Sequence, residues 1–448
     1  MPFQIMLSTI FDDLLAAVET KSFFLFYLLC KFRFKFFRTS DIRRYQRRRA
    51  KRIAAYATTH SAFFKNLYAG IDPGAFSSLP TVNKKIMMDH LTEYNTVGLT
   101  KNEILDFCLE VERTKDFSKR LKGFNVGMSS GTSGNKGVEI VSLEEETYMK
   151  AAFFARFDFP KHEKMRLAFI LRVSTPAFSF NRFGHSLTYV SQLNPSNEII
   201  RQLEAIQPTV VSAPPSMLKL IAREVETGTC AIHPKRLVSY AEILYPDVKE
   251  YLAKVFSCAV HEVYKCTEGP IAISCRHGRL HINEDLVLIE TLNRNGTVTP
   301  PGQPCQKLIV TDLHKTSQPI IRYELNDIIT VSTEACPCGS SFRVIERIQG
   351  RSDDLFWAKH AETGEWQYIF PDYISRAIIT ASDDIDEYQA VQNAPDNVLV
   401  RIQLRPGISH DHYIDKAVAD NITAVFAHYR CVQPNVSIVF GLPEPNSN

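Results

Sequence analysis

A loop rich in small and hydroxyl-bearing residues is the first part of this sequence that could do chemistry. Residues 129–137 read Ser-Ser-Gly-Thr-Ser-Gly-Asn-Lys-Gly. Glycines let the backbone approach an anion closely, N–H groups and hydroxyls donate hydrogen bonds to it, and Lys136 adds positive charge. The loop could therefore wrap the phosphates of a nucleotide, although a flexible linker would look similar and the spacing is not that of the Walker loop. The residues expected to contact phosphate are Ser129, Ser130, Gly131, Thr132, Ser133 and Gly134.

Three segments downstream carry groups suited to the rest of a nucleotide. Thr267 and Glu268 follow an expected strand, in the run Tyr-Lys-Cys-Thr-Glu-Gly. The Glu268 carboxylate could hold Mg²⁺ against phosphate oxygens, and the Thr267 hydroxyl could bond the α-phosphate. Asp327 could accept both ribose hydroxyls, and residues 350–354 read Gly-Arg-Ser-Asp-Asp. Each segment alone is more often a surface turn or an ion pair, so it is their order along the chain that indicates an ATP site.

A second constellation is independent of ATP. Cys275 and His281 are separated by five residues, and Cys336-Pro337-Cys338-Gly339 lies about sixty residues later. Thiolates and an imidazole suit tetrahedral Zn²⁺, although free buried thiols remain an alternative. The ten cysteines show no framework of closely spaced pairs and no export signal is evident, so we expect a reducing, cytoplasmic environment.

Positive charge is concentrated near the N-terminus. Residues 31–52 contain Asp41 as their only acid, and they follow the apolar run Phe-Phe-Leu-Phe-Tyr-Leu-Leu-Cys at 23–30. That run is too short to span a bilayer, and a secretory signal would place its basic part first. One interpretation is a surface helical hairpin whose Phe residues pack on the domain; the other is peripheral membrane contact. The small net charge of +3 argues against nucleic acid as a partner.

The pattern of elements favours an α/β protein with more than one folding unit. A chain of 448 residues is too long for one core. A basic amphipathic helix is expected over 40–58, and helical and strand segments alternate from 150 to 290, which indicates a mainly parallel sheet. Residues 284–335 are more typical of antiparallel strands.

Three regions follow from this pattern. We expect a basic helical extension at 1–60 packed on the main domain, a large domain with mixed sheets and helices at 61–351, and a small α+β domain at 352–448.

Taken in order, these motifs resemble the adenylate-forming superfamily of acyl-CoA synthetases, peptide-synthetase adenylation domains and luciferases. Within it the chain is most similar to the branch of phenylacetate–CoA ligase and the synthetase that adenylates the deazaflavin coenzyme of methanogens, and to an uncharacterised clade of that branch. The likeness runs from about residue 40 to 440.

The resemblance implies contacts for each part of ATP. Residues 129–137 match the phosphate loop. The segment 239–242, Ser-Tyr-Ala-Glu, matches the family's Gly-Gly-Glu strand end, which places Ala241 and Glu242 beside the nucleotide, and Tyr264 matches the aromatic residue beside adenine.

The remaining family positions fall further along the chain. Thr267 matches the α-phosphate contact, Glu268 the Mg²⁺ ligand, and Asp327 and Arg351 the two ribose ligands. Asp353 matches the hinge about which the small domain rotates between adenylation and thioester formation.

The resemblance also bears on the acyl pocket and on zinc. Phe180 and His185 lie in the segment that lines the acyl pocket in this superfamily, and Tyr240 lies beside it. An aromatic lining favours an aryl or other apolar acid, although Phe is more often plain core. Relatives in the phenylacetate-ligase branch share the Cys-x5-His and Cys-Pro-Cys-Gly motifs, which implies a structural zinc.

Three departures from the family pattern stand out. The phosphate loop lacks the usual Pro before Lys136 and is one residue short. Residues 355–360 read Leu-Phe-Trp-Ala-Lys-His where the ligases have an apolar run and Arg-Gly. No lysine stands at 441–448, where the family has Gly-Lys. Loss of that cation should slow adenylation, because preorganised charge is a large catalytic term.

The resemblance implies ATP-dependent activation of a small carboxylic acid as its acyl-adenylate, with Mg²⁺. The acyl group would then pass to CoA or a carrier-protein thiol, or to an amine. Two alternatives stay open at this point: a nucleotidyl transferase that leaves AMP on a hydroxyl, and a nucleotide-binding protein without turnover. A homodimer is compatible with the sequence, but nothing in it demands one.

Overall fold

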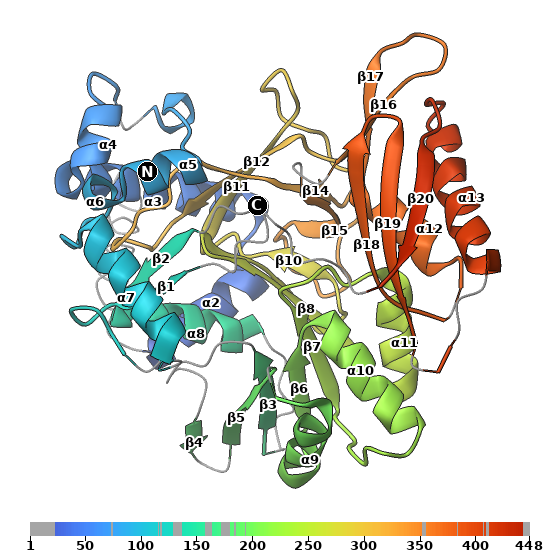
Figure 1. Ribbon diagram of the computed structural model, residues 1–448. Helices are drawn as coiled ribbons and strands as arrows, with labels where there is room; N and C mark the ends of the chain where they lie inside the picture. The colour runs from blue at the N-terminus through green and yellow to red at the C-terminus, as the bar shows by residue number, and fades with distance from the viewer. Residues whose placement is uncertain are drawn as a thin grey trace.

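The computed structural model describes residues 23–72, 75–114, 116, 119–128, 137–156, 164–171, 180–182, 185–192, 194–351, 355–382, 384–405, 407–408 and 412–441. A ten-stranded sheet runs through the main body, and the C-terminal elements, coloured orange to red, form a separate group beside it (Figure 1). Among the described helices, none combines the length and the apolar character that crossing a bilayer requires.

The N-terminal helices cover the main body. They are α2 Phe23–Phe36, α3 Thr39–His60, α4 Ala62–Leu67, α5 Lys84–Asp89, α6 Leu91–Tyr94 and α7 Lys101–Thr114, with the 3-10 turn η1 Phe76–Ser78. Phe26 and Cys30 of α2 pack against alanines of α8 Leu143–Arg156. In α3, Ile53 and Ala57 pack with Tyr323 in another cluster. The helix expected over 40–58 is therefore present as α3, one or two residues longer at each end.

The large sheet has the strand order β14-β15-β10-β9-β8-β7-β6-β3-β5-β4. Its strands are β3 Arg166–Leu171, β4 Phe180–Arg182, β5 His185–Ser191, β6 Val210–Ala213, β7 Arg236–Tyr240, β8 Ala259–Cys266, β9 Gly269–Ser274, β10 Leu280–Ile282, β14 Asp327–Val331 and β15 Val344–Arg351. The crossover helices are α9 Ser196–Ile206, α10 Pro215–Glu226 and α11 Pro246–Phe256. A proline opens both α10 and α11, where its missing N–H costs nothing because the first turn has no intrahelical acceptor.

The expectation of a mainly parallel sheet is only half right. The five strands β5, β3, β6, β7 and β8 are parallel. From β8 onward every neighbour is antiparallel. The reversal has a local cause: β8 and β9 are joined by Thr267 and Glu268 alone, and a two-residue connection can only make a hairpin. The motif expected at the α-phosphate is thus the tip of that hairpin.

Two smaller sheets complete the main body. Strands β1 Asn125–Met128 and β2 Val138–Val141 pair antiparallel on either side of the loop at 129–137. Strands β11 Val287–Leu292, β12 Lys307–Asp312 and β13 Tyr323–Leu325 form an antiparallel sheet, as expected for this stretch.

The C-terminal elements have their own core. They are β16 Phe356–Lys359, β17 Trp366–Ile369, α12 Pro371–Ile379, β18 Ile385–Ala394, β19 Asn397–Leu404, α13 His412–His428 and β20 Asn435–Phe440. Val400, Val418 and Phe426 are fully buried together between the sheet and the helices. An ion pair between Arg223 of α10 and Asp386 of β18 joins this region to the main body.

Candidate functional site

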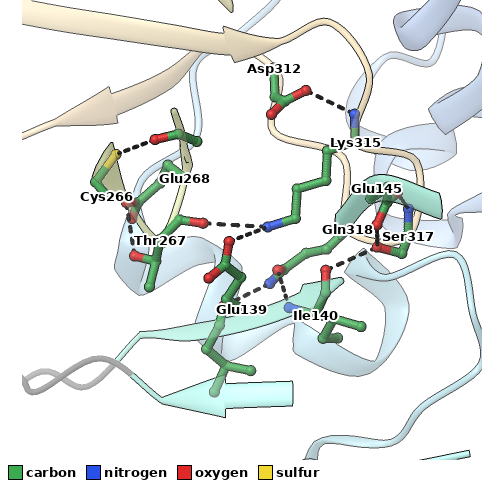
Figure 2. Close-up of polar contacts among 12 residues, drawn as sticks. Glu139, Ile140, Glu145, Cys266, Thr267, Glu268, Asp312, Lys315, Ser317 and Gln318 are labelled. Atoms are coloured by element: carbon green, nitrogen blue, oxygen red, sulfur yellow. Dashed lines mark hydrogen bonds and ion pairs between the residues drawn. The ribbon is translucent and has the colours of Figure 1, made fainter. Parts of the chain in front are cut away.

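The hairpin tip between β8 and β9 places the Thr-Glu motif in a crowded, polar environment. The Thr267 hydroxyl donates to Glu268 Oε2 at 2.9 Å, and the Glu268 side chain is buried (Figure 2). A Cβ on Gly269 would lie 3.3 Å from Asp312 Oδ2, so glycine allows β12 to approach the hairpin. A buried carboxylate oxygen beside a hydroxyl fits the hard oxygen ligation that Mg²⁺ prefers.

A buried lysine that the sequence analysis did not single out lies at this tip. Lys315 Nζ is 3.3 Å from the carbonyl oxygen of Thr267 and 3.6 Å from Glu139 Oε1 (Figure 2). Lys265 Nζ lies 3.2 Å from the other oxygen of Glu139. Burial pushes the pKa of Glu139 up, but the two ammonium groups bring it below its ordinary value. Glu139 is therefore ionised at neutral pH and ties β2 to the hairpin.

The turn that presents Lys315 is held by Asp312. Asp312 Oδ1 accepts hydrogen bonds from the backbone N–H groups of His314 and Lys315, both at 2.8 Å. Burial raises the pKa of Asp312 to about 6 in spite of these bonds and of the nearby Lys315 charge. The carboxylate thus fixes the direction in which Lys315 leaves the backbone.

Residues after Lys315 fasten the strand that follows the phosphate loop. Gln318 Oε1 accepts the N–H of Ile140, and Gln318 Nε2 donates to the carbonyl of Val138, both at 3.0 Å (Figure 2). The Gln318 side chain thus makes the hydrogen bonds to β2 that the backbone of a neighbouring strand would make. Glu145 Oε1 accepts the N–H of Ser317 at 2.8 Å. The C-terminal anchor of the loop is therefore held rigidly against the 315–318 segment.

Two of the residues expected at the adenosine, Tyr264 and Arg351, contact a third, Asp327. Asp327 and Arg351 are direct partners across the β14–β15 pair, and Arg351 Nε lies 3.7 Å from Asp327 Oδ1. The Tyr264 hydroxyl donates to Asp327 Oδ2 at 2.5 Å. Burial, and then the Asp327 charge, raise the pKa of Tyr264 well above its ordinary value, so the phenol stays a donor. Asp327 is thus fixed from two sides.

The strand end at 239–242 has the backbone that its resemblance to Gly-Gly-Glu implies. Ala241 has φ +67°, in the left-handed region where glycine is favoured. The Tyr240 hydroxyl donates to the carbonyl of Ile170, and its ring stacks on Phe169 with centroids 5.2 Å apart. The Glu242 carboxylate accepts the N–H and hydroxyl of Ser216, at 3.0 and 2.8 Å, and so caps α10. Its expected place beside ATP stays a prediction.

The acyl-pocket residues are not brought together. His185 opens β5 at the amino end of the parallel strands, where its Nδ1 accepts the N–H of Met165 at 3.1 Å. Tyr240 ends β7 at the carboxyl end of the parallel strands. By the strand register it lies about six residues, or roughly 20 Å, beyond His185 along the strand direction. Ligands of α/β sheets bind at the carboxyl ends, where Tyr240 lies and His185 does not, and both pocket assignments stay predictions. The hydrophobic pattern of a strand does not tell which of its ends faces the site.

Several expected site residues lie outside the described part of the chain. These are residues 129–136, which include Lys136 and the loop positions Ser129, Ser130, Gly131, Thr132, Ser133 and Gly134, together with Asp353 and the side chain of Phe180. Their roles remain predictions.

The four zinc candidates converge. The ligand atoms of Cys275, His281, Cys336 and Cys338 all lie within 4.8 Å of one another. His281 Nδ1 is bonded to the carbonyl of Phe342 at 2.8 Å, and His281 Nε2 is 3.4 Å from Cys338 Sγ.

Burial shifts the pKa values of the groups in this cluster. Burial lowers the pKa of His281 to about 4, so the imidazole is neutral and able to ligate. Burial raises the pKa of the Cys338 thiol to about 12, so the thiol keeps its proton unless a cation displaces it. Three sulfurs and an oriented imidazole nitrogen are a donor set that fits tetrahedral Zn²⁺.

Two curated proteins are similar to this chain. CapK of Staphylococcus aureus is 24% identical over 306 residues, which are 67% of this chain and 60% of that protein. The chain therefore spans less than two thirds of the length of CapK. The phenylacetate–coenzyme A ligase of Thermus thermophilus is 23% identical over 378 residues, 78% of each chain. None of the protein-family models matches.

Solved structures of 2-hydroxyisobutyryl-CoA ligase share the fold at 17% identity. In its postadenylation state the TM-score is 0.68, with 93% of this chain and 89% of that chain covered. In its thioesterification state the TM-score is 0.56. The chain therefore has the fold of this CoA ligase, and it is similar in sequence to CapK and to a phenylacetate–coenzyme A ligase.

Proposed function

We propose that this protein uses ATP to activate a carboxylic acid as its acyl-adenylate and passes the acyl group to the thiol of CoA or of a carrier-protein pantetheine. One observation carries the proposal. Tyr264, which bonds Asp327 beside Arg351, stands on β8 only three residues before Thr267 at the hairpin tip. One hairpin thus carries the groups expected at the adenosine and at the α-phosphate. The relatives named as CoA ligases support the thiol as acceptor.

In the proposed reaction the substrate carboxylate attacks the α-phosphorus of ATP, and pyrophosphate leaves. The Thr267 hydroxyl bonds the α-phosphate, and the Lys315 ammonium, held at the Thr267 carbonyl, adds positive potential where charge develops. Mg²⁺ on Glu268, when bound, supplies further neutralisation of phosphate charge. A thiolate then attacks the acyl carbon, the bond to the phosphate oxygen breaks, and AMP leaves.

The acid is proposed to be apolar, with aryl acids as the first candidates. The stacked rings of Phe169 and Tyr240 lie at the carboxyl end of the parallel strands, where substrates of such sheets bind. The similarity to a phenylacetate ligase points the same way.

ATP–pyrophosphate exchange across a panel of aryl, branched and hydroxy acids tests the activity. We expect exchange with at least one acid and its loss in Glu268→Gln. The matched control is Glu262→Gln, on the preceding strand β8 but paired with Lys249 outside the site, and it should retain exchange. Exchange that persists in Glu268→Gln would exclude this carboxylate as the metal ligand. ATP binding without exchange on any acid would overturn the ligase assignment in favour of a nucleotide-binding protein.

The Cys–His cluster is proposed to hold a structural Zn²⁺. It brings together β9, β10 and the segment before β15, all at the antiparallel end of the large sheet. The resemblance implies a structural role for these four residues and assigns them no catalytic part.

A further inference from the structure

Helix α2 presents large apolar side chains on two faces. Its inner face buries Phe26 and Cys30 against α8. Its outer face carries four side chains spaced four residues apart and exposed to 66, 44, 53 and 57%: Phe24, Leu28, Phe32 and Phe36. At this spacing they form a slowly winding stripe about 18 Å long. The packing of the Phe residues on the domain, one of the two interpretations of this segment, thus accounts only for the inner face.

Two lysines lie within the same outer face. Lys31 and Lys35 are exposed, and helical geometry places both within about 20° of Phe24 around the axis. Lys31 Nζ lies 5.0 Å from the centroid of the Tyr27 ring and Lys35 Nζ 5.1 Å from that of Phe36. A lysine side chain can lay its methylene groups along an apolar surface while its ammonium group stays in water.

Helix α3 extends the positive charge. Residues 31–52 hold eleven Lys and Arg against one Asp, a net charge of +10, whereas the whole chain carries +3. Arg33 stacks on Tyr45 at 4.6 Å, which places the start of α3 beside the end of α2. Exposed basic side chains of α3 are Arg43, Arg44, Arg47, Lys51 and Arg52.

We propose that the outer face of α2, with the exposed cations of α2 and α3, docks reversibly on an anionic phospholipid surface, lying in the interface without crossing it. Exposed Phe side chains can bury their rings at the headgroup boundary of a bilayer, and the cations complement the negative lipid headgroups. A second copy of the chain fits less well, because symmetric contact would bring these cations against each other. The inference is independent of the ligase activity.

Vesicle co-sedimentation of the full chain tests the proposal. We expect binding to phosphatidylcholine vesicles that contain phosphatidylglycerol, and binding at least about tenfold weaker to pure phosphatidylcholine or in high salt. Phe32→Gln/Phe36→Gln removes exposed apolar surface without touching the core and should lower affinity by about tenfold or more. Arg43→Gln/Arg44→Gln/Arg47→Gln should weaken binding to the anionic vesicles alone.

A matched control substitutes an exposed apolar residue elsewhere. Leu109→Gln, on the 60% exposed Leu109 of α7, should leave vesicle binding unchanged, and circular dichroism melting should show all variants folded. No binding to anionic vesicles, or equal binding by the Phe32/Phe36 variant, would overturn the proposal. The proposal would also be overturned if the wild type did not bind vesicles but formed a dimer, and if the Phe32/Phe36 variant broke that dimer in sedimentation equilibrium.

Discussion

The ammonium group of Lys315 lies 3.3 Å from the carbonyl oxygen of Thr267, inside a turn that Asp312 holds. Only 3% of Lys315 is exposed, and its other contact is Glu139 on the strand that follows the phosphate loop. One cation therefore contacts both the hairpin tip at Thr267 and the strand that follows the phosphate loop. This makes Lys315 a structural candidate for positive charge near the reacting phosphorus.

We predict that Lys315→Met lowers the rate of ATP–pyrophosphate exchange by about 100-fold or more, with a smaller change in the KM for ATP. Preorganised charge acts on the transition state more than on binding, and losses of such groups are typically this large. Steady-state exchange kinetics measure the two effects separately.

The control for Lys315 is a lysine that occupies a different environment. Lys359 Nζ lies 5.4 Å from the centroid of the Trp366 ring in the C-terminal region, and Lys359→Met should change exchange little if Lys315 is the working cation. The reverse result, with a silent Lys315→Met and an inactive Lys359→Met or Lys136→Ala, would show that another cation acts at the phosphate.

A second prediction concerns the Tyr264–Asp327 hydrogen bond. Tyr264→Phe removes the donor that fixes the Asp327 carboxylate, and we expect a three- to tenfold higher KM for ATP with little change in rate, in line with a net hydrogen-bond contribution of about 1 kcal/mol. Tyr251→Phe, which loses a bond to Glu226 outside the site, is the matched control. A KM unchanged in Tyr264→Phe would mean that Asp327 needs no second anchor.

The sequence predicted what depends on local pattern. The helix expected over 40–58 is present as α3, and the antiparallel strands expected over 284–335 are present as β11 to β13, because the periodicity of apolar side chains is a local signal. Thr267, Glu268, Asp327 and Arg351 could be named because each stands in a recognisable run.

What the sequence did not reveal depends on contacts between distant segments. Ile140 and Gln318 are 178 residues apart, and no periodicity links them or places Lys315 beside Thr267. The change from parallel to antiparallel strands follows from a two-residue connection that was interpreted as a motif, not as a hairpin. Nor did the sequence show that His185 would open β5, at the amino end of the parallel strands.

The raised pKa of Asp312 gives a third prediction. Its pKa is about 6 in the folded protein against 3.8 as the ordinary value, so the folded state binds the proton more tightly. The resulting stability is complete below about pH 4 and is lost as the pH rises through 6. Asp312→Asn cannot titrate, so the free energy of unfolding of the wild type should fall relative to this variant by roughly 2–3 kcal/mol between pH 4 and 7.

Denaturant titrations at several pH values measure the difference in free energy of unfolding between the wild type and Asp312→Asn. Backbone hydrogen bonds that the variant loses shift this difference by a constant, but they do not change how it depends on pH. Asp89→Asn is the contrasting variant. The hydrogen bond with Lys85 lowers the pKa of Asp89. The free energy of unfolding of the wild type should therefore rise with pH relative to Asp89→Asn, whereas it should fall relative to Asp312→Asn. If the difference in free energy of unfolding between the wild type and Asp312→Asn did not change with pH, the result would contradict the buried environment of Asp312.

A fourth prediction addresses the zinc cluster. Protein purified without chelator should contain about one zinc per chain, and Cys338→Ser should lower both the zinc content and the Tm, because metal binding adds to folding free energy. Cys258→Ser, a half-buried cysteine away from the cluster, should change neither. Less than about 0.3 zinc per chain in the wild type would leave the four residues as buried thiols and an imidazole.

The fifth prediction concerns the backbone at Ala241. Its φ of +67° is uncommon for a residue with a side chain and worse for a β-branched one. Ala241→Gly should therefore keep stability within about 1 kcal/mol and retain exchange activity, whereas Ala241→Val should cost about 1–2 kcal/mol and reduce exchange by displacing Tyr240 and Glu242. Thermal melts and exchange rates of the pair give the answer. Equal behaviour of the Gly and Val variants would mean that this strand end does not hold the left-handed conformation in solution.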